Sequence, residues 1–215
     1  VVPGQNFGGR LTGAAWEGKI PFVPMIYSED WLGDYHGRKA RNPASLPGSS
    51  GMFEGSQYLL AFNEPWMDIQ ANISAERVAE LWPQFQVKAE ELEKKIGKKV
   101  FLVSPTIEPP HTKDLLRGEV PQDASGWGFE KNKTELGVDG WLWSLRFFEL
   151  VEEKNLRVDA VSVHDYSRET FDLNARLTYV RYKFGRPVWL TEFNKGDGFF
   201  ELPREEHVAY MKQTL

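Results

Sequence analysis

The sequence predicts an α/β protein with a parallel sheet, and two observations lead to that fold class. Five short apolar runs are continuous rather than alternating, which is typical of strands covered on both faces. Helical patterns follow these runs, and strands that alternate with helices pair in parallel through right-handed crossovers. No internal repeat or domain boundary is found, so residues 1–215 are expected to form one domain.

Each predicted element has a local reason. The apolar runs that indicate strands cover residues 20–27, 58–62, 100–103, 158–163 and 187–190. A helix is expected over 74–96, because Ser74 is a good N-cap and Gly97 suits a left-handed C-terminal position. Pro83 should kink or divide that helix. Further helices are expected over 139–154, over 171–184 before Gly185, and from 203 onward.

Two long stretches, over 27–58 and 105–139, show no helical period. Loops of this length in a compact domain are usually functional, disordered or a sign of a wrong assignment. The chain also shows no strong strand over 1–19 and stops inside a helical pattern. Both ends therefore look cut.

Composition excludes several classes of function. The chain has 31 acidic and 26 basic side chains, without the concentrated basic surface that a nucleic acid requires. The absence of cysteine excludes disulfides, zinc–thiolate sites and thiol chemistry. No apolar stretch approaches the roughly 20 residues that span a membrane, and no signal-peptide pattern is found. Eight tryptophans are more than core packing needs, so several should line a half-exposed groove.

The predicted strands all end in polar residues on their carboxyl side. Because the carboxyl ends of parallel strands converge, two glutamates, two asparagines, a histidine and a tyrosine should face one opening. Apolar residues fix Glu64 at a strand end and Pro65 follows it, and Glu192 has a similar setting. Either glutamate could be an ordinary loop carboxylate, but their shared setting favours a chemical role for the pair.

Other chemistries lack the residues that they need. His164 is expected to be structural rather than a metal ligand, because the remaining histidines, His36, His111 and His207, show no ligand spacing. The glycine-rich motifs of nucleotide sites and the nucleophile elbow of serine hydrolases are also missing from the sequence. No metal and no cofactor is therefore predicted.

Two opposed glutamates suit cleavage of a glycosidic bond, in which one protonates the leaving oxygen and the other attacks or stabilises the anomeric carbon. Tryptophan rings offer flat apolar faces to the C–H side of a sugar. Trp66 and Trp31 follow predicted strand ends and are the candidate sugar platforms. Of the others, Trp189 is expected to pack against neighbouring side chains, and Trp82 and Trp141 are expected to lie in the core. No role is assigned to Trp127 or Trp143 from the sequence.

Six motifs in one consistent order resemble glycoside hydrolase family 128, the endo-β-1,3-glucanases of the clan A barrel type. The motifs lie at 59–65, 70–74, 81–83, 103–105, 158–166 and 187–193. The resemblance extends from about Phe22 to the end of the chain. It implies a modified (β/α)8 TIM-type barrel and retaining hydrolysis of β-1,3-glucan.

The resemblance also implies roles for single residues. By position, Glu64 matches the general acid/base and Glu192 the nucleophile, with carboxyl groups expected about 5 Å apart, as retention requires. Asn63 is expected to bond the sugar 2-hydroxyl. His164 and Tyr166 are expected to be a sugar contact and a partner for the nucleophile.

The sequence departs from the family pattern in three places. Asp165 stands where an aromatic or small residue is expected, so the local sugar subsite should differ. The first barrel strand is not recognisable near Val1, and the eighth would lie beyond Leu215. The barrel is therefore expected to be incomplete at both termini.

The expected partner is a β-glucan polysaccharide or oligosaccharide, bound by a monomer, with no role for a membrane or nucleic acid. The alternative is a non-catalytic β-glucan-binding protein on the same barrel, although a pure binder has no need of both glutamates. A third interpretation, a structural or interaction domain, leaves the clustering at strand ends unexplained. Glycosylation sequons at Asn72 and Asn132 favour the cell exterior or cell wall.

Overall fold

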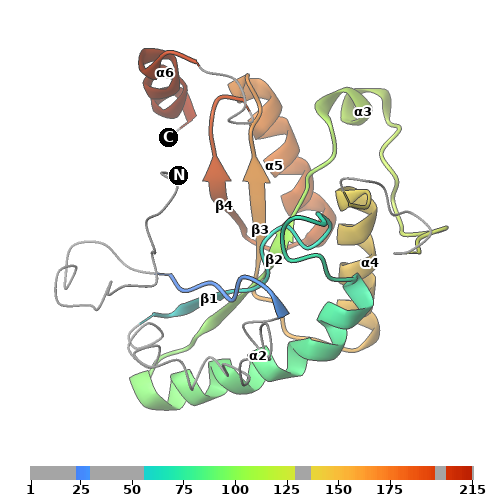
Figure 1. The fold of residues 1–215 in the computed structure, drawn as a ribbon, viewed down its shortest axis with the longest axis vertical. Helices are drawn as coiled ribbons and strands as arrows, with labels where there is room; N and C mark the ends of the chain where they lie inside the picture. Colours follow the sequence, from blue (N-terminus) through green and yellow to red (C-terminus); the bar gives the residue numbers. More distant parts are fainter. Residues whose placement is uncertain (1–22, 30–55, 129–136, 197–201, 215) are drawn as a thin grey trace.

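A computed structural model describes residues 23–29, 56–128, 137–196 and 202–214 of the chain. Four parallel strands form a sheet in the order β1-β2-β3-β4, and their direction turns progressively from β1 to β4 (Figure 1). The strands are β1 Tyr58–Leu60, β2 Phe101–Ile107, β3 Ala160–Asp165 and β4 Val188–Phe193. As far as these residues reach, the fold is an α/β half-barrel, in agreement with the predicted parallel sheet.

The helices are α2 Ala75–Ile96, α3 Thr112–Arg117, α4 Gly140–Glu153, α5 Thr170–Phe184 and α6 Arg204–Thr214. Helix α2 begins as predicted, because Oγ of Ser74 accepts a hydrogen bond from the backbone N–H of Arg77 at 3.1 Å. It ends at Gly97, whose φ of 66° is left-handed. No helix within the described ranges combines the length and apolarity needed to cross a membrane.

Helix α2 continues through Pro83, so of the two expected effects of this proline, division of the helix does not occur. A proline inside a helix removes one backbone hydrogen bond. The neighbouring Trp82 and Phe85 are fully buried, and their rings stack with centroids 5.2 Å apart. Tertiary packing of this face therefore holds the helix together across the missing bond.

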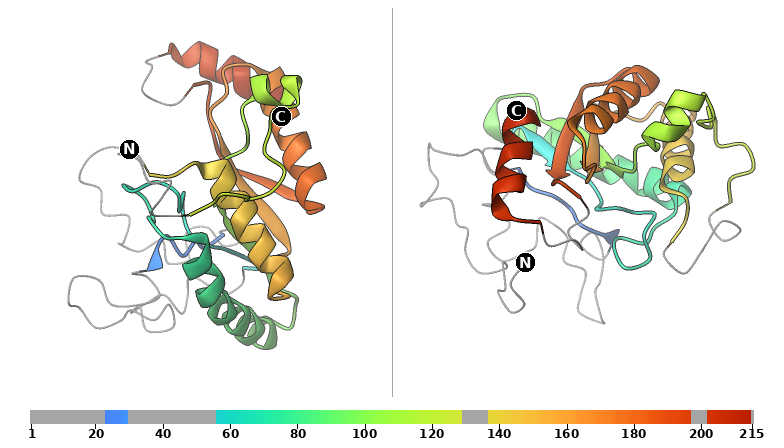
Figure 2. Two further views of the ribbon diagram at one scale, coloured as in Figure 1. Left: turned by 90° about the vertical axis from the view of Figure 1, so that its right-hand side faces the viewer. Right: turned by 90° about the horizontal axis from the view of Figure 1, so that it is seen from above.

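Two apolar clusters lie on opposite faces of the sheet. The larger one fills the space between the sheet and helices α2, α4 and α5, which cover one side of the strands (Figure 2). The smaller one comprises Leu60, Val103 and Ala160, with Trp189 packed against it. We call the face that carries this smaller cluster the inner face. The packing of Trp189 there confirms its predicted role.

The ladder between β2 and β3 contains a register shift. Val103 pairs with Ala160, but Thr106 pairs with Ser162, so β2 carries one residue more than β3 in this interval. Pro105 lies within the interval and has no amide proton to donate to the ladder, which is typical of a bulge. The shift keeps Val103 and Thr106 on the inner face although three positions separate them.

The ladder between β3 and β4 contains a second register shift. Leu190 pairs with Val163, but Glu192 pairs with His164, so Thr191 is an extra residue in β4. The two shifts therefore flank β3 on both of its edges. Bulges of this kind re-aim side chains and are common next to active sites.

Strand β2 extends further than predicted. It continues through Ile107, so Ser104 and Thr106 are buried within the sheet and do not lie at its carboxyl end. The predicted strand ended at residue 103, because the buried hydroxyl residues that follow interrupt the continuous apolar run. Glu108 is the residue that follows the true strand end.

Two further segments differ from the prediction. The short helix α3 lies in a stretch where no helix was expected, because six residues are too few to give a periodic pattern. In the described part of the predicted strand 20–27, Met25 forms an isolated parallel bridge with Leu60 of β1. Pro24, which lacks an amide proton, limits a longer ladder there.

Gly137 lets the turn after β1 meet the segment that leads into α4. Its φ is 122°, and a Cβ there would lie 2.1 Å from the backbone oxygen of Trp66. The obstacle is backbone in an antiparallel bridge between Met67 and Gly137, so rotating a side chain cannot relieve it. We expect Gly137→Ala to lower the free energy of unfolding by about 3 kcal/mol in urea denaturation.

Gly118→Ala is the matched control for this prediction. Gly118 also has a left-handed φ, 71°, but a Cβ there would meet nothing within 4 Å. The control should therefore lose only about 1 kcal/mol, the backbone cost alone. Equal losses in the two variants would contradict the close approach at Gly137.

Candidate active site

Side chains from three strand ends meet on the inner face of the sheet. Glu64 lies in the turn after β1, His164 in β3 and Glu192 in β4. Nδ1 of His164 lies 2.9 Å from Oε1 of Glu64, and its Nε2 lies 3.5 Å from Oε1 of Glu192. The two glutamates therefore face each other across a single imidazole ring.

The two carboxyl groups differ in exposure. The side chain of Glu64 is 14% exposed and that of Glu192 is 48% exposed, whereas His164 is almost fully buried. Glu64 also has a left-handed backbone, with φ of 39°, which costs a residue with a side chain about 1 kcal/mol or more. The backbone N–H of Met67 donates to the carbonyl of Glu64 at 3.0 Å and holds this turn.

Tyr166 orients the second carboxyl group. Its hydroxyl donates to Oε2 of Glu192 at 2.6 Å, the length of a charge-assisted hydrogen bond. Burial raises the pKa of Tyr166, and the hydrogen bond to Glu192 and the negative charges of both glutamates raise it further. Tyr166 therefore keeps its proton and remains a donor to Glu192.

A buried amide lies beside the first carboxyl group. Asn63 is buried, and its Nδ2 donates to Oε1 of Gln70 at 3.2 Å. The hydroxyl of Tyr27 donates to the same oxygen. Burial raises the pKa of Tyr27, the hydrogen bond with Asn63 lowers it, and the charges of Glu64 and Glu192 raise it. Sequence reasoning gave Tyr27 no role, although its place at a strand end was a signal.

Asp165 does not belong to the site. It follows His164 in β3, so its side chain points to the opposite face of the sheet. It is 1% exposed and forms an ion pair with Arg176 of α5 at 3.0 Å. Arg176 also donates to the carbonyls of Pro109 and Pro110. The expected effect of Asp165 on a sugar subsite is therefore wrong, since its carboxylate faces away from the site and joins β3 to α5.

The tryptophans are mostly packing residues. Trp66 is 7% exposed and lies in the core, so it offers little ring surface to a sugar, contrary to expectation. Trp31, the other predicted platform, lies outside the described residues. The indoles of three buried tryptophans donate to backbone carbonyls, which confirms the core assignment of Trp82 and Trp141 and adds Trp143.

A third carboxyl group, that of Glu108, lies within electrostatic reach of Glu64. A Cβ on Gly140 would lie 2.4 Å from Oε2 of Glu108, so Glu108 lies against the first residue of α4. Burial raises the pKa of Glu108; the nearby guanidinium of Arg176 lowers it, and the charge of Glu64 raises it. Sequence reasoning missed Glu108 because it ended the strand too early, although the two prolines after it mark the true end.

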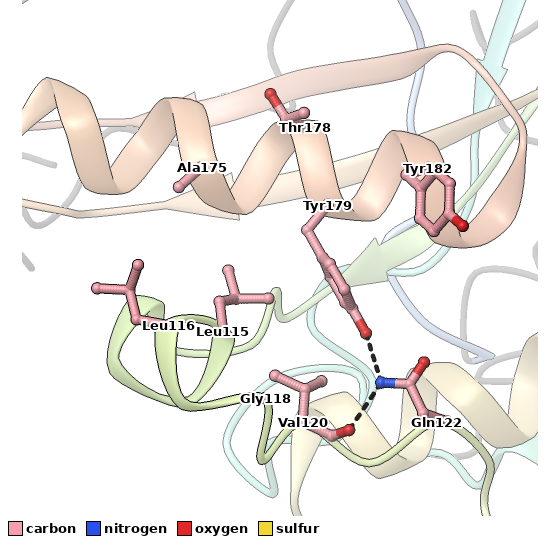
Figure 3. A pocket seen from close by; sticks show the side chains of 9 residues that line it. All are labelled: Leu115, Leu116, Gly118, Val120, Gln122, Ala175, Thr178, Tyr179 and Tyr182. Carbon is pink, nitrogen blue, oxygen red and sulfur yellow. Dashed lines mark hydrogen bonds between the residues drawn. The ribbon is translucent and has the colours of Figure 1, made fainter.

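Outside the glutamate pair, the described residues offer a pocket of different chemical character and no metal site. Within the described ranges, no three histidine, aspartate or glutamate side chains are grouped so as to hold a metal ion. A pocket of about 420 Å³ lies between α3 and α5, and Tyr179 in its lining accepts a hydrogen bond from Gln122 at 2.8 Å. Figure 3 shows the side chains that line this pocket. Its described lining is mainly apolar and has no carboxylate or histidine, so it offers no acid/base pair.

Comparison with known proteins gives a family. The family model described as the glycosyl hydrolase catalytic core matches residues 6–215. No curated protein is similar enough to match. The matching solved structures include endo- and exo-β-1,3-glucanases of glycoside hydrolase family 128, so the predicted resemblance to that family is confirmed.

Three solved structures illustrate this likeness. The subgroup I endo-β-1,3-glucanase from Amycolatopsis mediterranei, solved with laminaritriose, is 24% identical with a TM-score of 0.56, over 89% of this chain and 64% of that one. The subgroup II endo-β-1,3-glucanase from Sorangium cellulosum is 24% identical with a TM-score of 0.56, over 88% of this chain and 61% of that one.

The third is the subgroup III curdlan-specific exo-β-1,3-glucanase from Blastomyces gilchristii, solved with glucose. It is 23% identical with a TM-score of 0.56, over 94% of this chain and 69% of that one. At these identities the likeness establishes the fold. The chain spans 64% of the length of the Amycolatopsis protein.

The raised pKa of Glu108 predicts how stability depends on pH. The folded state favours the protonated form, so the protein loses stability as pH rises through the pKa of Glu108 and a buried negative charge forms. We expect Glu108→Gln to gain stability relative to the unmodified chain between about pH 4 and about pH 8, measured by urea denaturation. Glu205→Gln, at an exposed position on α6, should show no such trend, and a pH-independent difference for Glu108→Gln would contradict the account.

Proposed function

The chain belongs to the glycosyl hydrolase catalytic core family, and we propose that it is a retaining hydrolase of β-1,3-glucan. In this proposal Glu64 is the general acid/base and Glu192 is the nucleophile. The observation that carries the proposal is the placement of both carboxyl groups on opposite edges of the His164 ring. The β-1,3-glucanase activity of the structurally similar proteins supports the choice of substrate.

The proposed roles fit the surroundings of each carboxyl group. A general acid starts the reaction protonated, and the less exposed Glu64 then donates its O–H to Nδ1 of His164. The remaining ring proton, on Nε2, faces Glu192. A nucleophile must be ionised and held in place, and the short bond from Tyr166 supports that role for Glu192.

The proposed reaction has two steps. In the first, Glu64 gives its proton to the glycosidic oxygen while a carboxylate oxygen of Glu192 attacks the anomeric carbon, so the leaving sugar departs and a glycosyl ester forms. In the second, the ionised Glu64 takes a proton from water, and that water breaks the ester with net retention. Retention needs carboxyl groups about 5 Å apart, close enough for direct attack.

Neighbouring polar groups support binding of a sugar at this point. Asn63 is held by Gln70 next to Glu64, and we propose that it bonds the sugar 2-hydroxyl. The same proposal makes His164 a sugar contact and Tyr166 the partner of the nucleophile. Trp66 has no place among these contacts, because its ring is buried.

The proposal extends to the whole molecule. We propose that the described half-barrel belongs to a modified (β/α)8 barrel that works as a monomer, without a cofactor, outside the cell or in the cell wall. The sequons at Asn72 and Asn132 support that location. The molar mass from light scattering tests the monomeric state, and the mass of a dimer would contradict it. Detection of the protein in the medium of an expressing cell tests the proposed location.

A substrate panel tests the proposed activity. We expect the protein to release sugars from laminarin and to leave cellulose and mannan intact, with products resolved by length. Endo action, which the sequence resemblance implies, would give a range of lengths, whereas exo action would give one short product. Release from cellulose or mannan alone would contradict the choice of substrate and preserve the glycosidase class.

Two variants separate catalysis from binding in this panel. Glu64→Gln should slow laminarin hydrolysis about 10²- to 10⁴-fold, the usual contribution of a general acid, and leave glucan binding in place. Glu90→Gln, at an exposed position on α2, should leave the rate unchanged. Laminarin binding without turnover by the unmodified chain would instead support the alternative, a β-glucan-binding protein.

A further inference from the structure

The contacts of two consecutive residues in β4 break the normal alternation of a strand. Side chains one residue apart in a regular strand point to opposite faces, whereas those two apart share a face. Ser162 and His164 therefore share the inner face of β3. Oγ1 of Thr191 lies 2.8 Å from Oγ of Ser162, and Oε1 of Glu192 lies 3.5 Å from Nε2 of His164. Thr191 and Glu192 thus reach the same face.

The register shift explains how both side chains reach that face. Thr191 is the extra residue of β4. With regular pairing, Thr191 would lie opposite His164, and Glu192 would lie opposite Asp165 on the helix-covered face of the sheet. The hydroxyl of Thr191 donates to the backbone carbonyl of Val163 at 3.2 Å, directly across the shift. The side chain of Thr191 therefore ties the bulge to the neighbouring strand.

The direction of the remaining hydroxyl bonds follows from counting protons. A hydroxyl has one proton, and that of Thr191 goes to the carbonyl of Val163, so Thr191 must accept from Ser162. Ser162 has then used its own proton and must accept from Thr106, at 3.2 Å. The result is a directed chain of three hydroxyls across β2, β3 and β4.

Two of the three hydroxyls are buried, that of Thr191 is half-buried, and together they connect both register shifts. Thr106 and Ser162 are at most 1% exposed, and the backbone N–H of Ser162 also donates to Oγ of Ser104 inside the first shift, at 3.0 Å. A buried hydroxyl without a partner is costly, so each member depends on the others. The hydrogen-bonded hydroxyls therefore fix the backbone of both register shifts.

We propose that Thr191 is a positioning residue for Glu192, and that its hydroxyl holds the bulge that turns the carboxylate toward His164 and Tyr166. This inference deepens the proposed function, because it concerns the group proposed to act as nucleophile. Thr191 does not touch the substrate in this account. Its effect on the reaction passes through the position of Glu192.

The test compares Thr191→Val, which keeps the shape and removes the hydroxyl, with Thr191→Ser, which keeps the hydroxyl. A displacement of about 1 Å costs roughly 100-fold in rate, so Thr191→Val should lower kcat on laminari-oligosaccharides about 10- to 100-fold with KM nearly unchanged. Thr191→Ser should retain most of kcat. Thr178→Val, an exposed position on α5, is the matched control and should behave like the unmodified chain.

Crystal structures of the variants give a readout that does not depend on activity. In Thr191→Val, the 2.6 Å contact between Tyr166 and Glu192 should be lost, whereas Thr191→Ser should keep it. Should Thr191→Val fail to fold, Ser162→Ala removes the support of the Thr191 hydroxyl and should displace Glu192 in the same direction. A retained contact in the folded hydroxyl-free variant would overturn the proposal.

The outcomes also separate this inference from the proposed function. An unmodified chain that leaves laminarin intact, together with a displaced Glu192 in Thr191→Val, would remove the activity and keep the positioning role. Full laminarin activity in Thr191→Val would remove the positioning role and keep the activity. A loss of kcat that Thr191→Ser fails to rescue would show that the threonine methyl group, and not the hydroxyl, is needed.

Discussion

The pairing of β3 on both of its edges is the constraint on which the site depends. This strand is buried over its whole length, and a register shift interrupts the ladder on each side of it. The shifts decide which side chains of β2 and β4 face the same way as His164. Since His164 contacts both glutamates, the geometry of the carboxyl groups follows from the register of β3.

The site combines a buried scaffold with unequal carboxyl groups. Glu64 is mostly covered and sits on a strained turn, whereas Glu192 is half exposed and bonded to Tyr166. Unequal surroundings are what allow two like groups to take different parts in one reaction. On the opposite face of β3, the ion pair between Asp165 and Arg176 anchors the strand to α5 and leaves the inner face to the site.

Sequence reasoning recovered the parallel order of the strands and the convergence of Glu64, His164 and Glu192, because continuous apolar runs mark buried strands and their polar ends mark one edge. It failed where local rules were overridden. Buried hydroxyls hid the end of β2, and with it Glu108. Trp66 was expected to be exposed, but tertiary packing buried it. A register shift does not change the hydrophobic periodicity of a sequence. The face of the sheet to which Glu192 points could therefore not be predicted from the alternation of side chains.

In the proposed mechanism, Glu192 attacks the sugar while Glu64 transfers the proton. Incubation with a 2-fluoro-β-glucosyl substrate that has a good leaving group, followed by digestion and mass spectrometry, tests it directly. We expect one added sugar on the peptide that contains Glu192, because a retaining nucleophile forms a covalent ester that fluorine makes slow to hydrolyse. An adduct on the peptide that contains Glu64, or hydrolysis with inversion and no adduct, would contradict it.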